Sequence, residues 1–192
     1  MSSTVPPAPV AAPAASSGVG NAGMWIFLAT DAMGFGGLFI AYGVLRARAA
    51  TWPDARAHLA LAPAAVMTFA LLVSAFTAAQ AARAARPGAR RGWLVATAIL
   101  GLAFLAGEVA EYRRLAAGAD PVRLGPDLFG ATFYALTGYH GLHVLAGLLV
   151  LVGLLVAPRT RARHLEVAAI FWHFVDLAWI PIFTFVYLLP TS

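Results

Sequence analysis

The amino-acid sequence predicts an all-α integral membrane protein, a five-transmembrane-helix bundle that follows a disordered N-terminal tail. Of the 192 residues, 61% are hydrophobic and only 11% are charged, whereas a soluble domain carries about 25% charged residues. The mean hydropathy of the chain is +0.79. Five apolar runs each reach the length of about 20 residues that a helix needs to cross the hydrocarbon core. These observations predict that most of the chain lies within the lipid bilayer.

Residues 1–22 predict a disordered tail, because they are rich in Ala, Pro, Ser and Gly and carry no charged side chain. Four prolines between positions 6 and 13 break any helix there. The tail lacks the basic start and the uninterrupted apolar stretch of a signal peptide, so the first helix is expected to act as its own insertion signal. The membrane domain is expected to cover residues 23–192, with helices over residues 23–45, 61–83, 92–114, 129–156 and 166–189.

Local residue patterns refine the expected helices. Pro181 lies inside the fifth run, where it is expected to kink the helix or to free a carbonyl group. The fourth run is longer than a perpendicular span requires, so this helix is expected to tilt or to project from the membrane. In the second helix a small residue recurs at every fourth position, which allows close packing in lipid: Ala70, Ser74, Ala78 and Ala82.

The basic residues indicate the orientation of the chain. All 13 are arginines, and they lie in short segments between the apolar runs. This distribution is typical of membrane topology and argues against nucleic-acid binding. Seven arginines lie in the second-to-third and fourth-to-fifth loops and six in the other two loops, so we expect a cytoplasmic N-terminus and a periplasmic C-terminus.

Cysteine usage and composition narrow the class of protein further. The chain contains no cysteine, which excludes disulfides, thiolate metal sites and a cysteine nucleophile. No targeting peptide is recognisable, and the composition is typical of a GC-rich genome. Both observations favour the inner membrane of a bacterium over an organelle.

Acidic and histidine side chains lie inside the apolar runs, at depths where a charged group costs roughly 2.5–3.5 kcal/mol on insertion scales. His173 and Asp176 are three residues apart and share a helix face, so they are expected to satisfy each other or neighbours on another helix. The candidate set of buried polar or proton-related residues is Asp31, Glu108, Glu111, His140, His143, His173 and Asp176.

The three acids of the first and third helices each have two interpretations. Asp31 is either a proton relay or a protonated, hydrogen-bonded structural residue, since burial disfavours the charged form. Glu108 and Glu111 share a face and form either an acid–base or cation site or a structural helix end. In the structural interpretation Glu111 pairs with an arginine and Glu108 faces a buried partner.

The histidines also have two interpretations. His140 and His143 share a helix face, and together with His173 and Asp176 they offer the imidazole and carboxylate ligands of a metal site. However, three buried imidazoles are too few for a complete haem or copper centre. We therefore expect interhelical hydrogen bonds, no metal and no catalytic centre in this chain.

Several segments together resemble one family of membrane proteins. They are residues 23–33 (GMWIFLATDAM), 51–53 (TWP), 108–112 (EVAEY), 133–144 (FYALTGYHGLHV) and 171–179 (FWHFVDLAW). In order and spacing they are similar to the conserved segments of subunit III of the haem–copper terminal oxidases, which includes cytochrome c oxidase and cytochrome bo-type quinol oxidase members. The last two segments are the most specific, and the resemblance covers residues 23–189.

The resemblance implies a non-catalytic subunit of a proton-pumping oxidase that passes electrons from cytochrome c or quinol to oxygen. Such a subunit binds the side of subunit I, accompanies subunit II, holds phospholipid, and sustains proton uptake and turnover lifetime. It carries no haem or copper, because these cofactors belong to the partner subunits. The intramembrane acid of the family that reacts with carbodiimides maps onto Asp31.

Two departures from the family pattern keep other functions open. Many members have seven helices with a lipid cleft, whereas five are expected here, and Asp31 stands where cytochrome c oxidases usually have glutamate. The alternatives are a subunit-III-like component of a nitric oxide reductase, and a stand-alone transporter or proton channel. A third alternative is a redox enzyme that binds its own metal.

Overall fold

The computed structural model describes residues 16–53, 59–118, 122, 128–157 and 161–189. Helix α1 (Ser16–Arg48) begins inside the segment that was predicted to be the disordered tail. The helix-breaking prolines of that segment end at Pro13, so nothing in residues 16–22 interrupts an α-helix. The rest of the predicted tail, residues 1–15, lies outside the described residues.

The structure confirms the predicted class, because five helical segments of the described chain are long and apolar enough to cross a membrane. After α1 come α3 (Leu61–Arg83), α4 (Pro87–Ala117), α5 (Leu128–Val156) and α6 (Ala162–Ile182). Helix α4 begins earlier than expected because Pro87 occupies its first turn, where the missing N–H and the fixed φ of proline suit a helix start.

The end of the last helix differs from a regular α-helix. Six residues form the π-helical segment η1 (Phe183–Leu188), in which the N–H of Leu189 donates to the carbonyl of Thr184 at 3.0 Å. Pro181 lies just before this segment, and its missing N–H and bulky ring disturb the ladder of the preceding turn. π-Helical turns are rare and occur mostly as short interruptions of α-helices, and this one leaves Val186 and Tyr187 buried.

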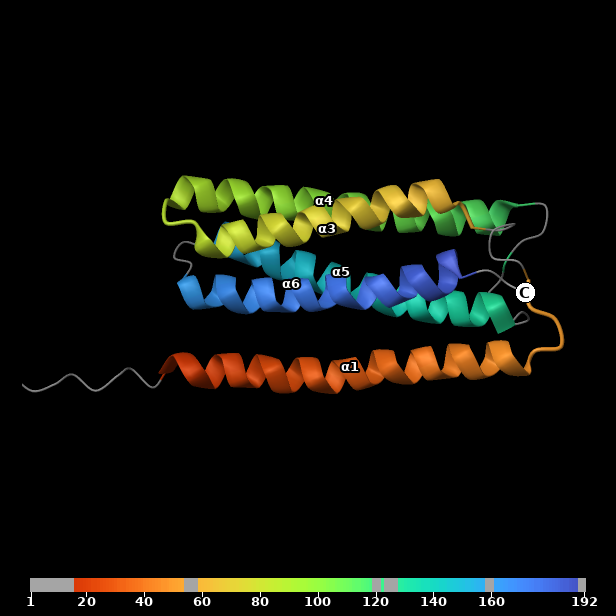
Figure 1. The fold of residues 1–192 in the computed structure, drawn as a ribbon. Coiled ribbons are helices and arrows are strands. Elements are labelled where there is room, and N and C mark those ends of the chain that lie inside the picture. The colour runs from red at the N-terminus through yellow and green to blue at the C-terminus, as the bar shows by residue number, and fades with distance from the viewer. Residues whose placement is uncertain (1–15, 54–58, 119–121, 123–127, 158–160, 190–192) are drawn as a thin grey trace, which may run out of the picture.

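The helices lie side by side in layers (Figure 1), with α3 and α4 on one side, α5 and α6 in the middle and α1 along the other edge. Helix α3 packs most extensively on α4, while α6 touches α3, α5 and α1. Helix α1 packs mainly on α5 and α6. Its buried residues follow one stripe, Leu28, Asp31, Phe35 and Tyr42. Most of α1 therefore faces lipid or a partner protein.

Glycines bring three helices together around one tryptophan. A Cβ atom at Gly101 of α4 would lie 2.6 Å from Cη2 of Trp172, and one at Gly147 of α5 would lie 2.8 Å from Cε3 of the same side chain. Trp172 of α6 is only 1% exposed. Only glycine therefore allows α4 and α5 to close on this indole without a shift in packing.

Hydrogen bonds between side chains tie α3 to its neighbours. The indole N–H of Trp172 donates to Ser74 Oγ at 2.8 Å, and that of Trp179 donates to Thr68 Oγ1 at 2.9 Å. Thr77 on α3 lies 2.8 Å from Thr97 on α4, hydroxyl to hydroxyl. Each of these polar side chains thus has a partner on another helix, as an apolar solvent favours.

Candidate functional site

The intramembrane polar residues gather in three separate places. Asp31 meets His143 between α1 and α5, the two glutamates lie between α4 and its neighbours, and His140 contacts α6. Among the described residues, no group of three or more His, Asp or Glu side chains is arranged to hold a metal ion. The predicted residues therefore do not form one site: five of them make separate contacts, and His173 and Asp176 belong to none of these.

Asp31 forms the polar contact between α1 and the rest of the bundle. The hydroxyl of Tyr139 donates to Asp31 Oδ1 at 2.8 Å. Nε2 of His143 lies 3.1 Å from Oδ1 and 3.1 Å from Oδ2 of the same carboxyl group. Tyr139 and His143 are four residues apart on α5, so both side chains reach α1 from one helix face.

The hydrogen bonds constrain the tautomer of His143. Nδ1 of His143 lies 2.7 Å from the carbonyl oxygen of Tyr139, and a carbonyl oxygen only accepts, so Nδ1 carries a hydrogen. Nε2 and the Asp31 carboxyl group then share one proton, either as imidazolium and carboxylate or as imidazole and carboxylic acid. Both forms have zero net charge, which suits a group buried in the membrane.

A glycine and a phenylalanine hold α1 against this cluster. A Cβ atom at Gly34 would lie 2.8 Å from the hydroxyl oxygen of Tyr139. The ring of Phe35 packs against Tyr139 and His143, at centroid distances of 4.8 and 5.3 Å. Gly34 therefore permits the close approach of α1, and Phe35 excludes lipid from the hydrogen bonds.

Glu108 lies against the backbone of α5. Its Oε1 accepts a hydrogen bond from the Tyr112 hydroxyl at 2.9 Å, and that hydroxyl also lies 2.7 Å from Oγ1 of Thr137. A Cβ atom at Gly141 would lie 2.6 Å from Glu108 Oε2. Gly141, the second glycine of the GYHGLHV segment, thus makes room for the Glu108 carboxyl group.

Glu111 connects α4 to the π-helical end of the chain. The hydroxyl of Tyr187 donates to Glu111 Oε2 at 2.6 Å, and Arg114 Nη2 lies 3.4 Å from Oε1. This geometry agrees with the structural interpretation, in which Glu111 pairs with an arginine and Glu108 with a buried partner. The two carboxyl groups have separate tyrosine partners.

His140 is a buried link between α5 and α6. Its Nε2 lies 3.2 Å from the carbonyl oxygen of Val175, so Nε2–H donates to it. The ring packs between Phe104 and Trp179, at centroid distances of 5.3 and 4.9 Å. His140 is fully buried and belongs to the aromatic core of the bundle.

The expected pairing of His173 with Asp176 is wrong. Asp176 is buried, and within the described residues neither of its carboxyl oxygens has a hydrogen-bond partner. His173 was expected to be buried but is exposed on the surface of α6. Three residues turn an α-helix by roughly 300°, so the two side chains point about 60° apart around the helix axis. This separation is enough to place one side chain inside the bundle and the other outside.

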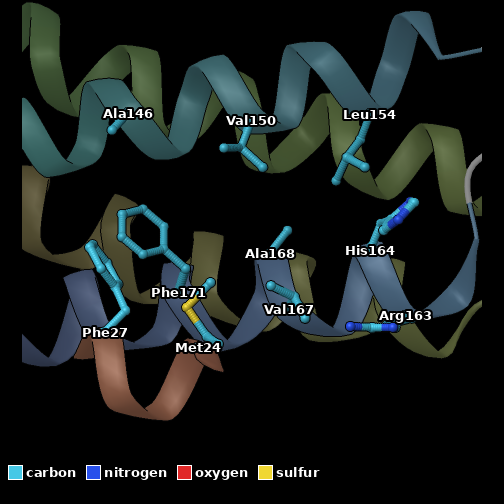
Figure 2. A pocket seen from close by; sticks show the side chains of 10 residues that line it. All are labelled: Met24, Phe27, Ala146, Val150, Leu154, Arg163, His164, Val167, Ala168 and Phe171. Carbon is cyan, nitrogen blue, oxygen red and sulfur yellow. The ribbon is translucent and has the colours of Figure 1, made fainter. Parts of the chain in front are cut away.

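A groove opens between α1, α5 and α6, with a volume of about 730 Å³. Figure 2 shows its lining, with Met24 and Phe27 from α1, Val150 among the residues of α5, and Arg163 and His164 together at one end. Its walls are otherwise apolar. The sequence did not predict this groove, because one of its walls comes from α1, which is distant in the sequence from α5 and α6.

The tyrosine partners were also missed. Tyr139 lies four residues before His143, and Tyr112 lies four residues after Glu108, so helix spacing offered a signal for both. Tyr187 follows Glu111 by 76 residues, and no local pattern relates these two residues.

Comparison with known proteins shows the family of this chain. The family model described as cytochrome c oxidase subunit III matches residues 11–191. Cytochrome c oxidase subunit 3 of Thermostichus vulcanus is 35% identical over 177 residues, which cover 87% of this chain and 86% of the relative. The corresponding protein of Synechocystis sp. is 38% identical, with coverage of 87% and 74%.

A relative with a different electron donor is equally similar. Cytochrome bo(3) ubiquinol oxidase subunit 3 of Pseudomonas aeruginosa is 37% identical over 177 residues, which cover 87% of this chain and 83% of the relative. The matches extend over all five membrane helices and include every segment on which the resemblance was based. This chain therefore belongs to the cytochrome c oxidase subunit III family and is a multi-pass membrane subunit of the haem–copper oxidase type.

Proposed function

We propose that this chain is the non-catalytic subunit III of a proton-pumping haem–copper terminal oxidase, where it stabilises subunit I and supports proton uptake. The observation that carries the proposal is the Asp31–His143–Tyr139 cluster, which places a buried carboxyl group in the membrane. Asp31 is also the residue that the family resemblance assigns as the intramembrane acid. Haem and copper reside in the partner subunits I and II.

The geometry of the Asp31 cluster supports a role in proton uptake. His143 Nε2 and the Asp31 carboxyl group share one proton. Transfer of this proton from one group to the other leaves the net charge of the pair unchanged. The cluster thus holds a proton inside the membrane and avoids the cost of burying a net charge there. We propose that this pair supports proton supply to subunit I.

The groove between α1, α5 and α6 supports a role in lipid binding. Its apolar walls suit an acyl chain, and Arg163 and His164 at one end suit a phosphate headgroup. We propose that one phospholipid lies here. The composition supports a bacterial inner membrane, and the arginine distribution supports a cytoplasmic position for the N-terminus and for the Arg163 end of the groove.

Purification of the tagged chain from its native membrane in mild detergent tests the proposed function. We expect a haem–copper subunit I to co-purify, identified by mass spectrometry, with its haem bands in the optical spectrum. Recovery of the chain alone and without colour would contradict the proposal. Recovery with the catalytic subunit of a nitric oxide reductase would assign it to that complex instead.

A further inference from the structure

Two buried glutamates on α4, Glu108 and Glu111, lie one helical turn apart. Their carboxyl groups interact electrostatically. Two carboxylates that share a region of low dielectric constant repel each other, and such a pair commonly keeps one proton. The hydrogen bonds around each carboxyl group indicate which of the two holds it.

Glu111 has the surroundings of an ionised carboxylate. Arg114 Nη2 lies 3.4 Å from its Oε1, and the Tyr187 hydroxyl donates to its Oε2 at 2.6 Å. Tyr187 is buried, and among the described residues Glu111 is the only acceptor for its hydroxyl hydrogen. A proton on Oε2 would leave that hydrogen without an acceptor, and a proton on Oε1 would face the guanidinium group of Arg114. Both contacts therefore favour a negative charge on Glu111.

Glu108 lacks such partners. Among the described residues it forms no ion pair with a basic side chain. Its Oε2 lies against the backbone of α5, where a Cβ atom at Gly141 would be 2.6 Å away. Gly141 lies in the interior of α5, and the N–H groups inside a helix are already bonded to the preceding turn. This surface therefore offers no free donor to a negative charge, which favours the neutral acid.

The hydroxyl groups beside Glu108 fit both of its protonation states. When Glu108 is ionised, the Tyr112 hydroxyl donates to Oε1 at 2.9 Å, and the Thr137 hydroxyl donates to the carbonyl of Phe133 at 2.7 Å. When Glu108 is protonated, Oε1–H donates to the Tyr112 oxygen, and Tyr112 donates to Thr137 Oγ1 at 2.7 Å. Thr137 keeps its bond to Phe133, so every hydrogen has an acceptor in both states. Rotation of one hydroxyl hydrogen connects the two states.

The other ionisable groups near Glu108 do not place a positive charge beside it. Apart from Glu111 they are tyrosines, which are neutral at physiological pH: Tyr112, Tyr134 and Tyr187. Arg83 is the only ionisable residue of α3, and it precedes the start of α4, which lies about 32 Å along that helix from Glu108. His140 on α5 donates to a carbonyl of α6.

We propose that Glu108 is a proton-binding site inside the membrane, which holds one proton as a neutral carboxylic acid and exchanges it with water, while Glu111 stays ionised. The proton binds to Oε1 of Glu108, and the Tyr112 hydrogen turns to Thr137 without leaving its oxygen. This site is separate from the Asp31 cluster, because Gly141 and His143 point about 200° apart around α5. The inference goes beyond the proposed function and holds for this chain in whichever complex contains it.

Infrared spectroscopy of the purified chain, together with the subunits that accompany it, tests this proposal. A protonated carboxyl group has a C=O stretch that differs from the carboxylate bands and shifts when D2O replaces H2O. In the H2O-minus-D2O difference spectrum at neutral pH, Glu108→Gln should lose one carboxylic-acid band, and Glu108→Asp should restore one. Glu166→Gln replaces an exposed glutamate of α6 and is the matched control, which should keep the band.

A pair of tyrosine variants identifies the protonated carboxyl group independently, and it keeps the proposal testable if Glu108→Gln fails to assemble. Tyr112→Phe removes the hydroxyl that contacts Glu108 and should shift the frequency of the carboxylic-acid band. Tyr187→Phe removes the hydroxyl that contacts Glu111 and should leave the band in place.

Two results would overturn the proposal. An unchanged difference spectrum for assembled Glu108→Gln would show that Glu108 is ionised. A band that shifts in Tyr187→Phe but not in Tyr112→Phe would assign the proton to Glu111. Neither result affects the proposed function, which fails if no oxidase subunit co-purifies with the unsubstituted chain.

Discussion

At the scale of single residues, Asp31 differs from the other buried acids because its partner can exchange a proton with it. Glu108 and Glu111 each contact a tyrosine hydroxyl, which holds its proton far more tightly than an imidazole does. Asp31 faces His143, whose other nitrogen is held by a backbone carbonyl. The proton between Asp31 and His143 therefore has two positions within one hydrogen bond.

Asp31→Asn should preserve the contact between α1 and α5 but abolish proton sharing. The amide oxygen still accepts from Tyr139, while the amide cannot exchange a proton with His143. We expect the complex to assemble with unchanged haem content, to take up protons more slowly and to lose activity earlier during turnover. Stopped-flow proton uptake and the decay of oxygen consumption measure both effects.

Asp176→Asn is the matched control for that experiment. Asp176 is also a buried aspartate, but among the described residues its carboxyl oxygens have no hydrogen-bond partner. We expect this variant to behave like the unsubstituted oxidase. Unchanged proton uptake and lifetime in Asp31→Asn, with normal assembly, would remove the proton role of Asp31 and leave a structural one.

The sequence could predict which polar residues lie in the membrane but not which of them meet. The apolar runs place Asp31 and His143 at membrane depth, yet 112 residues separate them, and only the packing of α1 on α5 brings them together. The error at His173 has a related cause. Three-residue spacing puts two side chains on neighbouring parts of a helix surface, and the boundary between the buried and exposed faces falls between them.

At the scale of helices, the apolar runs predicted α3 to the residue and α5 to within one residue. Helices α1 and α4 extend beyond both predicted ends and α6 begins earlier than predicted, because a helix can continue outside the lipid without being apolar. The π-helical segment was not predicted. A proline indicates that a helix is disturbed, but tertiary contacts such as that of Tyr187 with Glu111 decide how the backbone responds.

Helix packing gives a prediction at two glycines. Gly101→Ala should destabilise the bundle by about 1–3 kcal/mol, the usual effect of overpacking, because the new Cβ would lie 2.6 Å from Trp172. Gly153→Ala should be neutral or stabilising by up to about 1 kcal/mol, since nothing lies within 4 Å of that Cβ. Unfolding of the purified chain in mixed detergent measures both.

The two variants control for each other, since both replace a glycine by alanine within a membrane helix. Equal unfolding free energies for Gly101→Ala and the unsubstituted protein would show that Trp172 does not require the close approach of α4. A destabilised Gly153→Ala would show that a Cβ atom is not tolerated at this position and would contradict the open space around Gly153.

At the scale of the whole molecule, the bundle has an inner and an outer part. Helices α3, α4, α5 and α6 share a core of aromatic rings and interhelical hydrogen bonds, whereas α1 adds to it along one stripe. That attachment leaves hollows on both sides of the contact between α1 and α6. One has Arg163 and His164 at its end, and the other is lined by the exposed His173.

The lipid groove gives the last prediction. Val150→Trp should fill the groove and displace the proposed phospholipid, because Val150 is one of its lining residues. Val152→Trp is the matched control, since Val152 is similarly exposed, at 51% against 48%, but lies outside the groove. Native mass spectrometry of the purified complex should show one fewer phospholipid for Val150→Trp alone. Equal lipid content in the two variants, with intact assembly, would mean that the groove does not retain a lipid and that Arg163 and His164 serve another contact.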